Sequence, residues 1–337
     1  MFFFINLNKM FFIFILFFST LISISSNSWL GCWIGLEINL LSFIPLISNS
    51  NNLLSSEGSL KYFLVQSIAS INLLFYILLN MMFMKMFEMN NFMSIMMNSS
   101  LFMKMGSAPF HWWFPNIIDG LSWFNNFLLM SWQKISPIIL LSYYFNKNFL
   151  IIIIIMNAII GAIGGLNQTS LRKLMAFSSI NNLSWMLSSI MISENLWIFY
   201  FVFYCMLISI MCFMFYMLNL YFINQLFFIN FNYLIKLNLL INFLSLGGLP
   251  PFIGFFPKWI IINSLLNNNL ILINFILIMS SLIMLFFYIR IIYSSFMFNY
   301  LKLKWINNYI KNKMFYSLNT MSMMSILGLI LSTFFFM

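Results

Sequence analysis

The feature that most constrains this chain is a series of apolar stretches, each about as long as a membrane is thick. Stretches near residues 149–165 and 270–298 show the pattern, with almost no charged side chain inside. A membrane-spanning helix needs about 20 such residues. Only 6% of the 337 residues are charged, against about 25% in a typical soluble domain. We therefore predict an all-α polytopic membrane protein.

Hydropathy divides the chain into about eleven predicted spans with short loops, forming a single transmembrane domain over residues 1–337. An odd number of spans places the two termini on opposite sides of the membrane. The predicted spans are about 1–22, 26–47, 59–82, 92–118, 121–145, 149–165, 172–192, 195–219, 236–265, 270–298 and 315–336.

The basic residues provide a test of this count, because inner loops of membrane proteins are enriched in Lys and Arg. Lys85 and Lys147 fall on the outer side if the N-terminus lies inside. The inner side then receives the larger group: Lys9, Arg172, Lys173, Lys302, Lys304, Lys311 and Lys313. The net charge of +10 is thus an orientation signal, and no nucleic-acid partner is expected.

Two of the predicted spans are interrupted by glycine and proline. The first interruption is KMGSAPFHWWFP, with Gly106 and Pro109, and the second is LGGLPPFIGFFPK, with Gly247, Gly248, Pro250 and Pro251. Proline removes a backbone donor and clashes with the preceding turn, so we predict two discontinuous helices. Paired broken helices in two halves are typical of a transport site. Two unrelated structural kinks are the alternative.

Four charged residues lie within predicted spans, and we predict that they form a proton relay: Glu37, Lys104, Lys134 and Lys258. A charge at mid-span costs roughly 2.5–3.5 kcal/mol. Burial lowers the pKa of a lysine and raises that of a glutamate, so both approach the range of reversible protonation. Structural ion pairs, or lysines that extend to the interface, are the alternative.

His111 follows the first interruption and is a second candidate for proton transfer, because an unperturbed imidazole titrates near neutral pH. An interfacial role beside Trp112 and Trp113 is equally compatible with the sequence. The chain has one histidine and three cysteines, too few for most iron–sulfur or haem sites. It also lacks phosphate-binding glycine motifs. We expect no redox cofactor, nucleotide or metal in this chain.

Five stretches together resemble the antiporter-like subunits of respiratory complex I in their mitochondrially encoded form. They cover about residues 27–260, with similar organisation onward to the C-terminus. The abundance of Met, Phe, Ile and Asn also suits an AT-rich organelle gene. The stretches are NSWLGCWIGLEINLLSFIPL, KMGSAPFHWWFPNIIDGLSW, SWQKISPIILLSY, GGLNQTSLRKLMAFSSINNLSWM and NFLSLGGLPPFIGFFPKW.

The resemblance implies an antiporter-like fold of two inverted five-helix repeats and a final helix. The repeats would cover about residues 1–147 and 148–298, and the final helix about 314–337. It also implies roles for four residues. Glu37 matches the conserved glutamate of the family, Lys134 the central lysine, and Lys104 and Lys258 the lysines of the two broken helices. Lys104 precedes its prolines whereas Lys258 follows its own, so the equivalence of the two breaks stays open.

The resemblance further implies a non-redox subunit of an NADH:ubiquinone reductase that moves protons from matrix to intermembrane space. NADH, FMN, iron–sulfur clusters and ubiquinone would be held by other subunits. The partners would be lipids and other membrane-arm subunits, and the location the mitochondrial inner membrane, with the N-terminus in the matrix. Two alternatives remain: a cation/proton antiporter subunit without redox coupling, and a structural scaffold of the membrane arm.

Overall fold

The computed structural model describes residues 7–49, 52–83, 90–228 and 233–297, together with 319–320, 322–323 and 325–326. Within these ranges the regular structure is helical, with one isolated bridge between Ser170 and Phe222. The chain divides into two compact units, residues 1–153 and 154–337, at a boundary inside one helix. Each unit is described below by itself.

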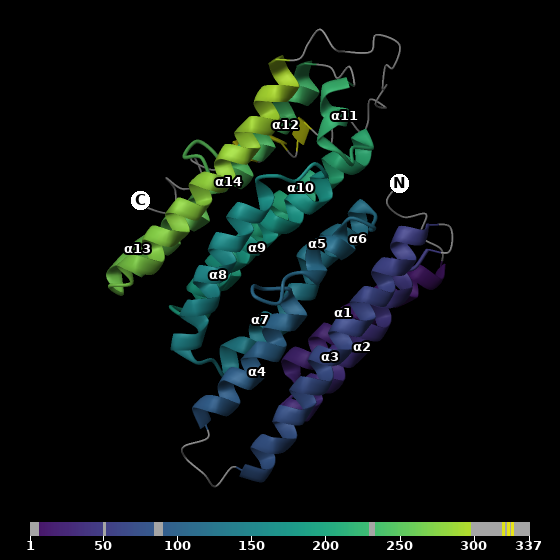
Figure 1. Cartoon of the computed structure of the whole chain (residues 1–337), viewed down its shortest axis with the longest axis vertical. Helices are drawn as coiled ribbons and strands as arrows, with labels where there is room; N and C mark the ends of the chain where they lie inside the picture. The colour runs from purple at the N-terminus through teal and green to yellow at the C-terminus, as the bar shows by residue number, and fades with distance from the viewer. Residues whose placement is uncertain are drawn as a thin grey trace. The chain divides into compact units, whose positions relative to one another are not determined.

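The first unit is built of helices, some of them long and others of only two turns (Figure 1). Ser28 begins the second of them, because its side chain accepts a hydrogen bond from the Gly31 amide at 3.2 Å, as an N-cap serine does. The helices are α1 (Leu7–Ser25), α2 (Trp29–Ile47), α3 (Leu53–Phe83), α4 (Asn90–Met105), α5 (Trp113–Ile118), α6 (Trp123–Met130), α7 (Trp132–Tyr143) and the start of α8 (Lys147–Gly165).

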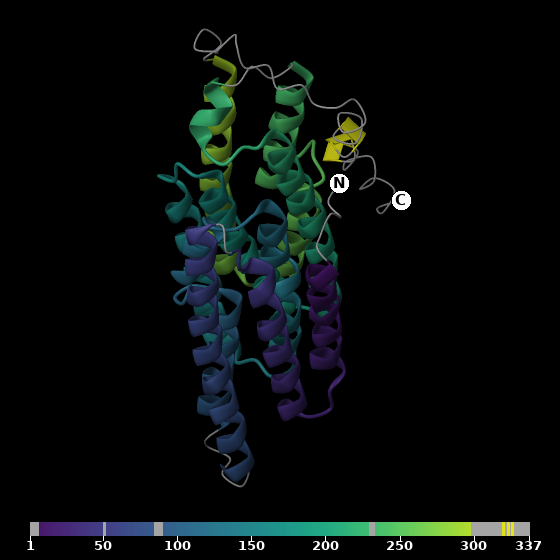
Figure 2. The same cartoon turned by 90° about the vertical axis from the view of Figure 1, so that its right-hand side faces the viewer.

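Small residues allow α1 and α2 to pack closely, and Figure 2 shows them side by side with α3. A Cβ on Gly35 would lie 2.7 Å from the Ser23 amide nitrogen, so only glycine fits at this contact. Ser19 and Ser23 are fully buried on the facing surface of α1. This is the small-residue packing common between membrane helices, and it fixes the helix that carries Glu37.

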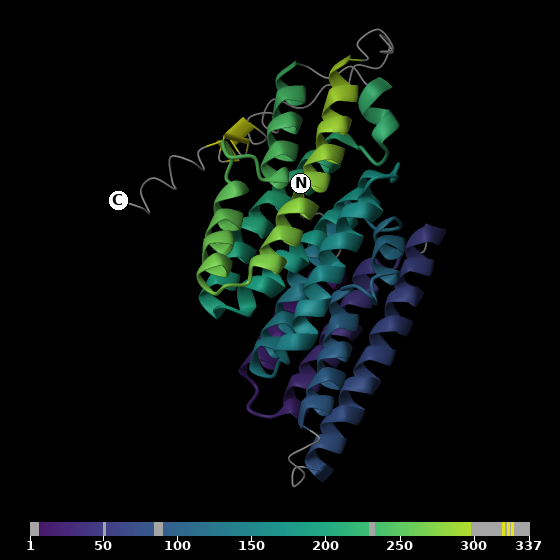
Figure 3. The same cartoon turned by 60° about the vertical axis from the view of Figure 1, so that its left-hand side comes forward.

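The second unit contains the rest of α8 and the remaining helices. Figure 3 shows α12 and α14 running side by side, with α13 following the interruption at the end of α12. The helices are α9 (Leu171–Ile190), α10 (Glu194–Leu218), α11 (Ile223–Phe228), α12 (Tyr233–Gly247), α13 (Phe255–Asn267) and α14 (Ile271–Met297).

The most buried helix of the second unit is α9, although it is rich in serine and asparagine. Each of its serines donates its hydroxyl hydrogen to the carbonyl three residues earlier in the same helix, as Ser184 does to Asn181 at 2.6 Å. Helix α8 approaches α9 closely at Gly161, since a Cβ on this glycine would lie 2.6 Å from the Asn181 amide nitrogen.

Helices occupy every predicted span up to Met297. Six helices of the described part are long and apolar enough to cross a membrane: α1, α2, α3, α8, α10 and α14. The predicted span 121–145 differs from the structure, because it is divided at Ser131 into α6 and α7. The short helix α11 lies in a segment that the sequence places in a loop.

Parts of the predicted topology lie outside the described residues. They include most of the final helix at 314–337 and the loop lysines Lys85, Lys302, Lys304, Lys311 and Lys313. The single domain, the two repeats and the count of eleven spans stay predictions.

Candidate proton-relay site

In the first unit, α4 ends at a glycine turn directly after Lys104. Gly106 has a φ of 69°, a conformation that glycine adopts without a steric penalty. The Ser107 amide donates to the Phe102 carbonyl at 3.1 Å, which is the six-to-one bond of a Schellman motif. Pro109 follows in a cis peptide. The predicted interruption of this helix is confirmed.

The carbonyls at the end of α4 receive side-chain donors in place of the helical amides that they lose. The Gln66 amide of α3 donates to the Lys104 carbonyl at 3.1 Å, and the Trp113 indole donates to the Met103 carbonyl at 3.2 Å. A broken helix at membrane depth needs such partners, because lipid supplies none. Gln66 and Trp113 therefore stabilise the interruption.

Lys104 is buried, with 7% of its surface exposed. Its charge interacts with that of Glu37 on α2. The buried Oε1 oxygen of Glu37 has no hydrogen-bond partner among the described residues, so this oxygen can still accept a hydrogen bond. The alternative in which Lys104 extends to the membrane surface does not agree with this burial.

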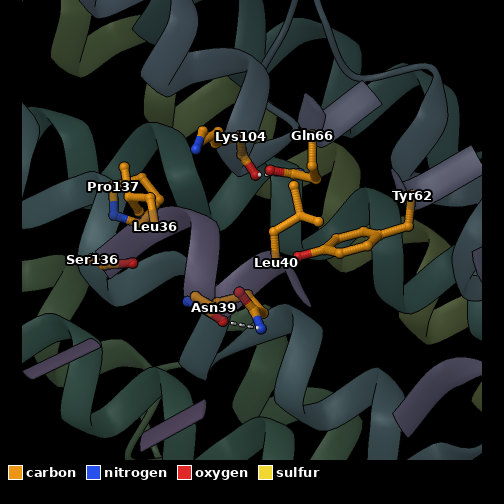
Figure 4. A pocket seen from close by; sticks show the side chains of 9 residues that line it. Leu36, Asn39, Leu40, Tyr62, Gln66, Lys104, Ser136 and Pro137 are labelled. Carbon is orange, nitrogen blue, oxygen red and sulfur yellow. Dashed lines mark hydrogen bonds between the residues drawn. The ribbon is translucent and has the colours of Figure 1, made fainter. Parts of the chain in front are cut away.

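A small cavity of about 10 Å³ adjoins Lys104, close to the minimum space for one water molecule. Figure 4 shows side chains from α2, α3 and α7 around it. Gln133 of α7 donates to the Asn39 side chain of α2 at 2.9 Å, and the buried Ser136 hydroxyl has no hydrogen-bond partner in the described structure. The lining is Leu36, Asn39, Leu40, Tyr62, Gln66, Lys104, Gln133, Ser136 and Pro137.

Lys134 is the most buried charge of the chain's described part, with 1% exposed. It lies in the first turn of α7, just after the division at Ser131. Its ammonium nitrogen is 5.3 Å from the centroid of the Phe114 ring, a favourable cation–π arrangement. Gln133 and Ser136, its neighbours on α7, line the Lys104 cavity. The first unit thus brings Glu37, Lys104 and the Lys134 helix together.

In the second unit, α12 ends in the same kind of turn. Gly248 has a φ of 81°, and the Leu249 amide donates to the Leu244 carbonyl at 3.3 Å. Pro250 and Pro251 follow before α13 begins at Phe255. The second predicted interruption is also confirmed, and both breaks use a Schellman-type end.

Lys258 reaches back from α13 to the end of α12. Its ammonium donates to the Gly247 carbonyl at 3.1 Å and lies 5.8 Å from the centroid of the Trp185 ring. This contact gives a physical reason for the different order of lysine and proline at the two breaks. At the end of α4, the Lys104 carbonyl accepts a hydrogen bond from Gln66 of another helix. At the end of α12, the Gly247 carbonyl accepts one from Lys258, which follows the break.

His111 and Asp119 have surroundings that the sequence did not fully predict. His111 is buried against Trp112, with ring centroids 4.9 Å apart, and its Nδ1 has no hydrogen-bond partner among the described residues. Proton transfer and an interfacial role both stay predictions for His111. Asp119 follows α5, whereas the N-cap of α6 is Ser122.

Several polar residues of these sites were missed from the sequence. They are Gln66, Asn39 and Gln133 in the first unit, and Asn182, Tyr200 and Tyr204 in the second. The signal that could have found them is a polar side chain inside an apolar span, since such residues usually face the bundle interior.

A sequence profile of the family described as NADH:quinone oxidoreductase/Mrp antiporter, TM, matches residues 26–284, which include both helix breaks and all four relay candidates. The chain belongs to this antiporter family.

Similar proteins named NADH-ubiquinone oxidoreductase chain 2 support this assignment. The protein from Aedes aegypti is 50% identical over 97% of both chains, and that from Anopheles gambiae is 49% identical over 90% of both. The protein from Canis lupus is 38% identical over 87% of this chain and 88% of its own.

Two solved structures show the antiporter-family fold. A chain of respiratory complex I from Thermus thermophilus has a TM-score of 0.84 and 17% identity, covering 97% of this chain and 79% of that one. A chain of the Mrp complex from a Dietzia species has a TM-score of 0.74 and 15% identity, covering 83% and 59%. At these identities the likeness concerns the fold alone.

Proposed function

We propose that this chain is a proton-translocating subunit in the membrane arm of NADH:ubiquinone oxidoreductase, in the mitochondrial inner membrane. Relatives that are similar to this chain over most of their length bear the name of that enzyme. The proposal rests on one observation above all: Lys104, Lys134 and Lys258 are buried, in a chain that belongs to an antiporter family. Desolvated lysines of this kind mark proton pathways in membrane proteins.

In the proposed relay, Glu37 modulates the charge of Lys104, Lys134 holds the mobile proton, and Lys258 passes it toward the exit or a neighbouring subunit. His111 is a possible additional carrier. Electron transfer in other subunits supplies the energy, and this chain holds no redox cofactor of its own. Moving one proton against the membrane potential requires about 2.3 kcal/mol per 100 mV.

The proposed topology has eleven spans, arranged as two inverted five-helix repeats and a final helix. The N-terminus lies in the matrix and the C-terminus in the intermembrane space. The bias of basic residues toward the inner loops supports this orientation. The amino-acid usage supports a mitochondrial gene.

The central test replaces Lys134 with methionine, which keeps most of the side-chain volume and removes the charge. We expect Lys134→Met to assemble into the complex and to lose most proton pumping per NADH oxidised. Pumping is measured with a pH-sensitive dye in sealed inner-membrane vesicles, normalised to the assembled complex. A variant that assembles and pumps normally would show that the chain is a scaffold.

The related antiporter hypothesis predicts a different result. It requires cation-dependent proton flux through vesicles in which NADH oxidation is absent. Flux of that kind, lost in Lys134→Met, would favour an exchanger without redox coupling. No flux under these conditions, together with NADH-dependent pumping, supports the redox-coupled proposal.

A further inference from the structure

The second unit contains a short stretch near its C-terminal end whose buried side is polar (yellow in Figure 3). The described residues between 319 and 326 are helical. Asn319, Ser322 and Ser325 are spaced three apart, so they follow one side of this helical stretch. Ser322 and Ser325 are buried. Buried polar groups are normally hydrogen-bonded, so the partners of these residues show what the stretch binds.

Asn238 of α12 is the first partner. Its side-chain amide donates to the Asn319 side-chain oxygen, and its own side-chain oxygen lies 3.0 Å from the Ser322 hydroxyl. This hydroxyl is also 2.9 Å from the Asn319 carbonyl, so its hydrogen is shared between two acceptors. Asn238 is buried and lies about two and a half turns before the break at Gly247.

The second partner is the connection that follows the break. The Ile253 amide donates to the Ser325 carbonyl at 3.1 Å, and the Ile253 carbonyl accepts from the Phe256 amide at 3.1 Å, in the first turn of α13. The connection also lies directly on α12, since a Cβ on Gly254 would be 1.7 Å from the Ser245 carbonyl oxygen.

Residues 319–326 therefore bind α12 before its break and the connection after it. A broken helix lacks the continuous series of backbone hydrogen bonds that fixes the direction of an intact helix, and lipid cannot replace them. Contacts from outside must then set the position of the part that follows the break. That part carries Lys258, whose ammonium donates back to the Gly247 carbonyl at 3.1 Å.

We propose that Asn238 and Ser322 are positioning residues, which hold residues 319–326 across the break of α12 and so keep the Lys258 ammonium at the end of that helix. They act on Lys258 through Ser325 and Ile253. This inference rests on the proposed relay role of Lys258. It adds a requirement: the stretch must be bound to α12 for Lys258 to transfer protons efficiently.

The first measurement is hydrogen exchange of the connection in purified, assembled complex. Asn238→Leu keeps a similar shape and removes the hydrogen bonds of this side chain, and Ser322→Ala removes the hydroxyl. We expect each variant to speed exchange of the Ile253 amide about five- to tenfold, the effect of losing one hydrogen bond. Mass spectrometry of peptides that cover residues 248–256 gives the rate.

Two matched controls lie in the same unit. Asn242→Leu makes the same change one turn further along α12, at a buried residue whose side-chain amide has no hydrogen-bond partner among the described residues. Ser280→Ala removes a buried hydroxyl of α14 that donates to the Leu277 carbonyl of its own helix. Neither control should speed exchange at Ile253.

The second measurement is the number of protons pumped per NADH oxidised by assembled complex. We expect Asn238→Leu and Ser322→Ala to lower this ratio, because Lys258 is displaced. A purely structural role would reduce the amount of assembled complex and leave the ratio unchanged. The double variant should pump no less than Asn238→Leu alone, since both changes remove one shared contact.

Unchanged exchange at Ile253 in both variants would overturn the inference, and so would equal acceleration in Asn242→Leu. A normal pumping ratio despite faster exchange would also contradict it. If neither variant assembles, the contact is structural and a positioning role is wrong. In each case the relay itself survives if assembled Lys258→Met loses pumping. Normal pumping by assembled Lys258→Met would instead contradict the proposed role of Lys258.

Discussion

At the scale of the residue, Phe114 connects the first helix break to the central lysine. A Cβ on Gly106 would lie 3.0 Å from the Phe114 side chain, and the Lys134 ammonium lies 5.3 Å from the centroid of the same ring. The glycine is therefore required twice, for its positive φ and for the position of the ring. A change at Gly106 should act on Lys134 without touching it.

We predict that Gly106→Ala destabilises the subunit by about 1–2 kcal/mol, the cost of a left-handed alanine, and also lowers pumping. Stability is measured as the complex that stays assembled after heating in mild detergent. The matched control is Gly58→Ala on α3, where a Cβ would make an ordinary 3.8 Å contact with the Ile117 carbonyl. This control should be neutral or slightly stabilising. Equal behaviour of the two variants would contradict the argument.

The sequence identifies the charged members of the site but not their partners. A lysine inside an apolar span is visible in the linear sequence, and so Lys104, Lys134 and Lys258 can be found from hydropathy alone. Gln66 is 38 positions from the carbonyl that it binds. No local pattern specifies that pairing, because it depends on how α3 packs against α4.

At the scale of the element, the two broken helices end in the same kind of glycine turn, but different side chains pair their freed carbonyls. Both α4 and α12 end in a glycine with positive φ and a six-to-one hydrogen bond. The freed carbonyls are then paired by Gln66 in one case and by Lys258 in the other. At the first break the donor is neutral, whereas at the second break the charged lysine itself binds the backbone.

Gln66→Leu should therefore affect the break of α4 without removing any charge. We expect a loss of about 1–3 kcal/mol in stability, the cost of an unpaired buried carbonyl, and reduced pumping through the displaced Lys104. Heat resistance of the assembled complex and dye-monitored pumping are the measurements. Ser67→Ala, at a half-buried neighbour that bonds only within its own helix, should resemble the unaltered protein. Unchanged stability in Gln66→Leu would mean that another donor replaces the glutamine.

Glycine and proline explain why the two breaks could be predicted and the third discontinuity could not. Proline and glycine indicate a broken helix directly in the sequence. The division at Ser131 lies six residues before Pro137, and no such residue marks it. The burial of α9 was equally hidden, because hydropathy counts its serines as polar although each is satisfied inside the helix.

At the scale of the whole molecule, the proposed topology gives opposite locations to the two termini. We expect antibodies against the N-terminal residues to bind only after the inner membrane is permeabilised. Antibodies against the C-terminal residues should bind to mitoplasts, in which only the outer membrane is open. Protease protection of the same epitopes checks the result. Both epitopes on one side would require an even number of spans.

The hydrogen bonding of the buried serines has a consequence for leakage. A hydroxyl that donates to its own helix must break that bond and rotate before it can pass a proton onward. Helices rich in such serines, of which α9 is the main example, should therefore block the uncontrolled return of protons that would dissipate the gradient. The buried hydroxyl of Ser136 lacks a partner among the described residues and lines the Lys104 cavity. Ser136 is therefore better suited than the serines of α9 to pass a proton onward beside Lys104.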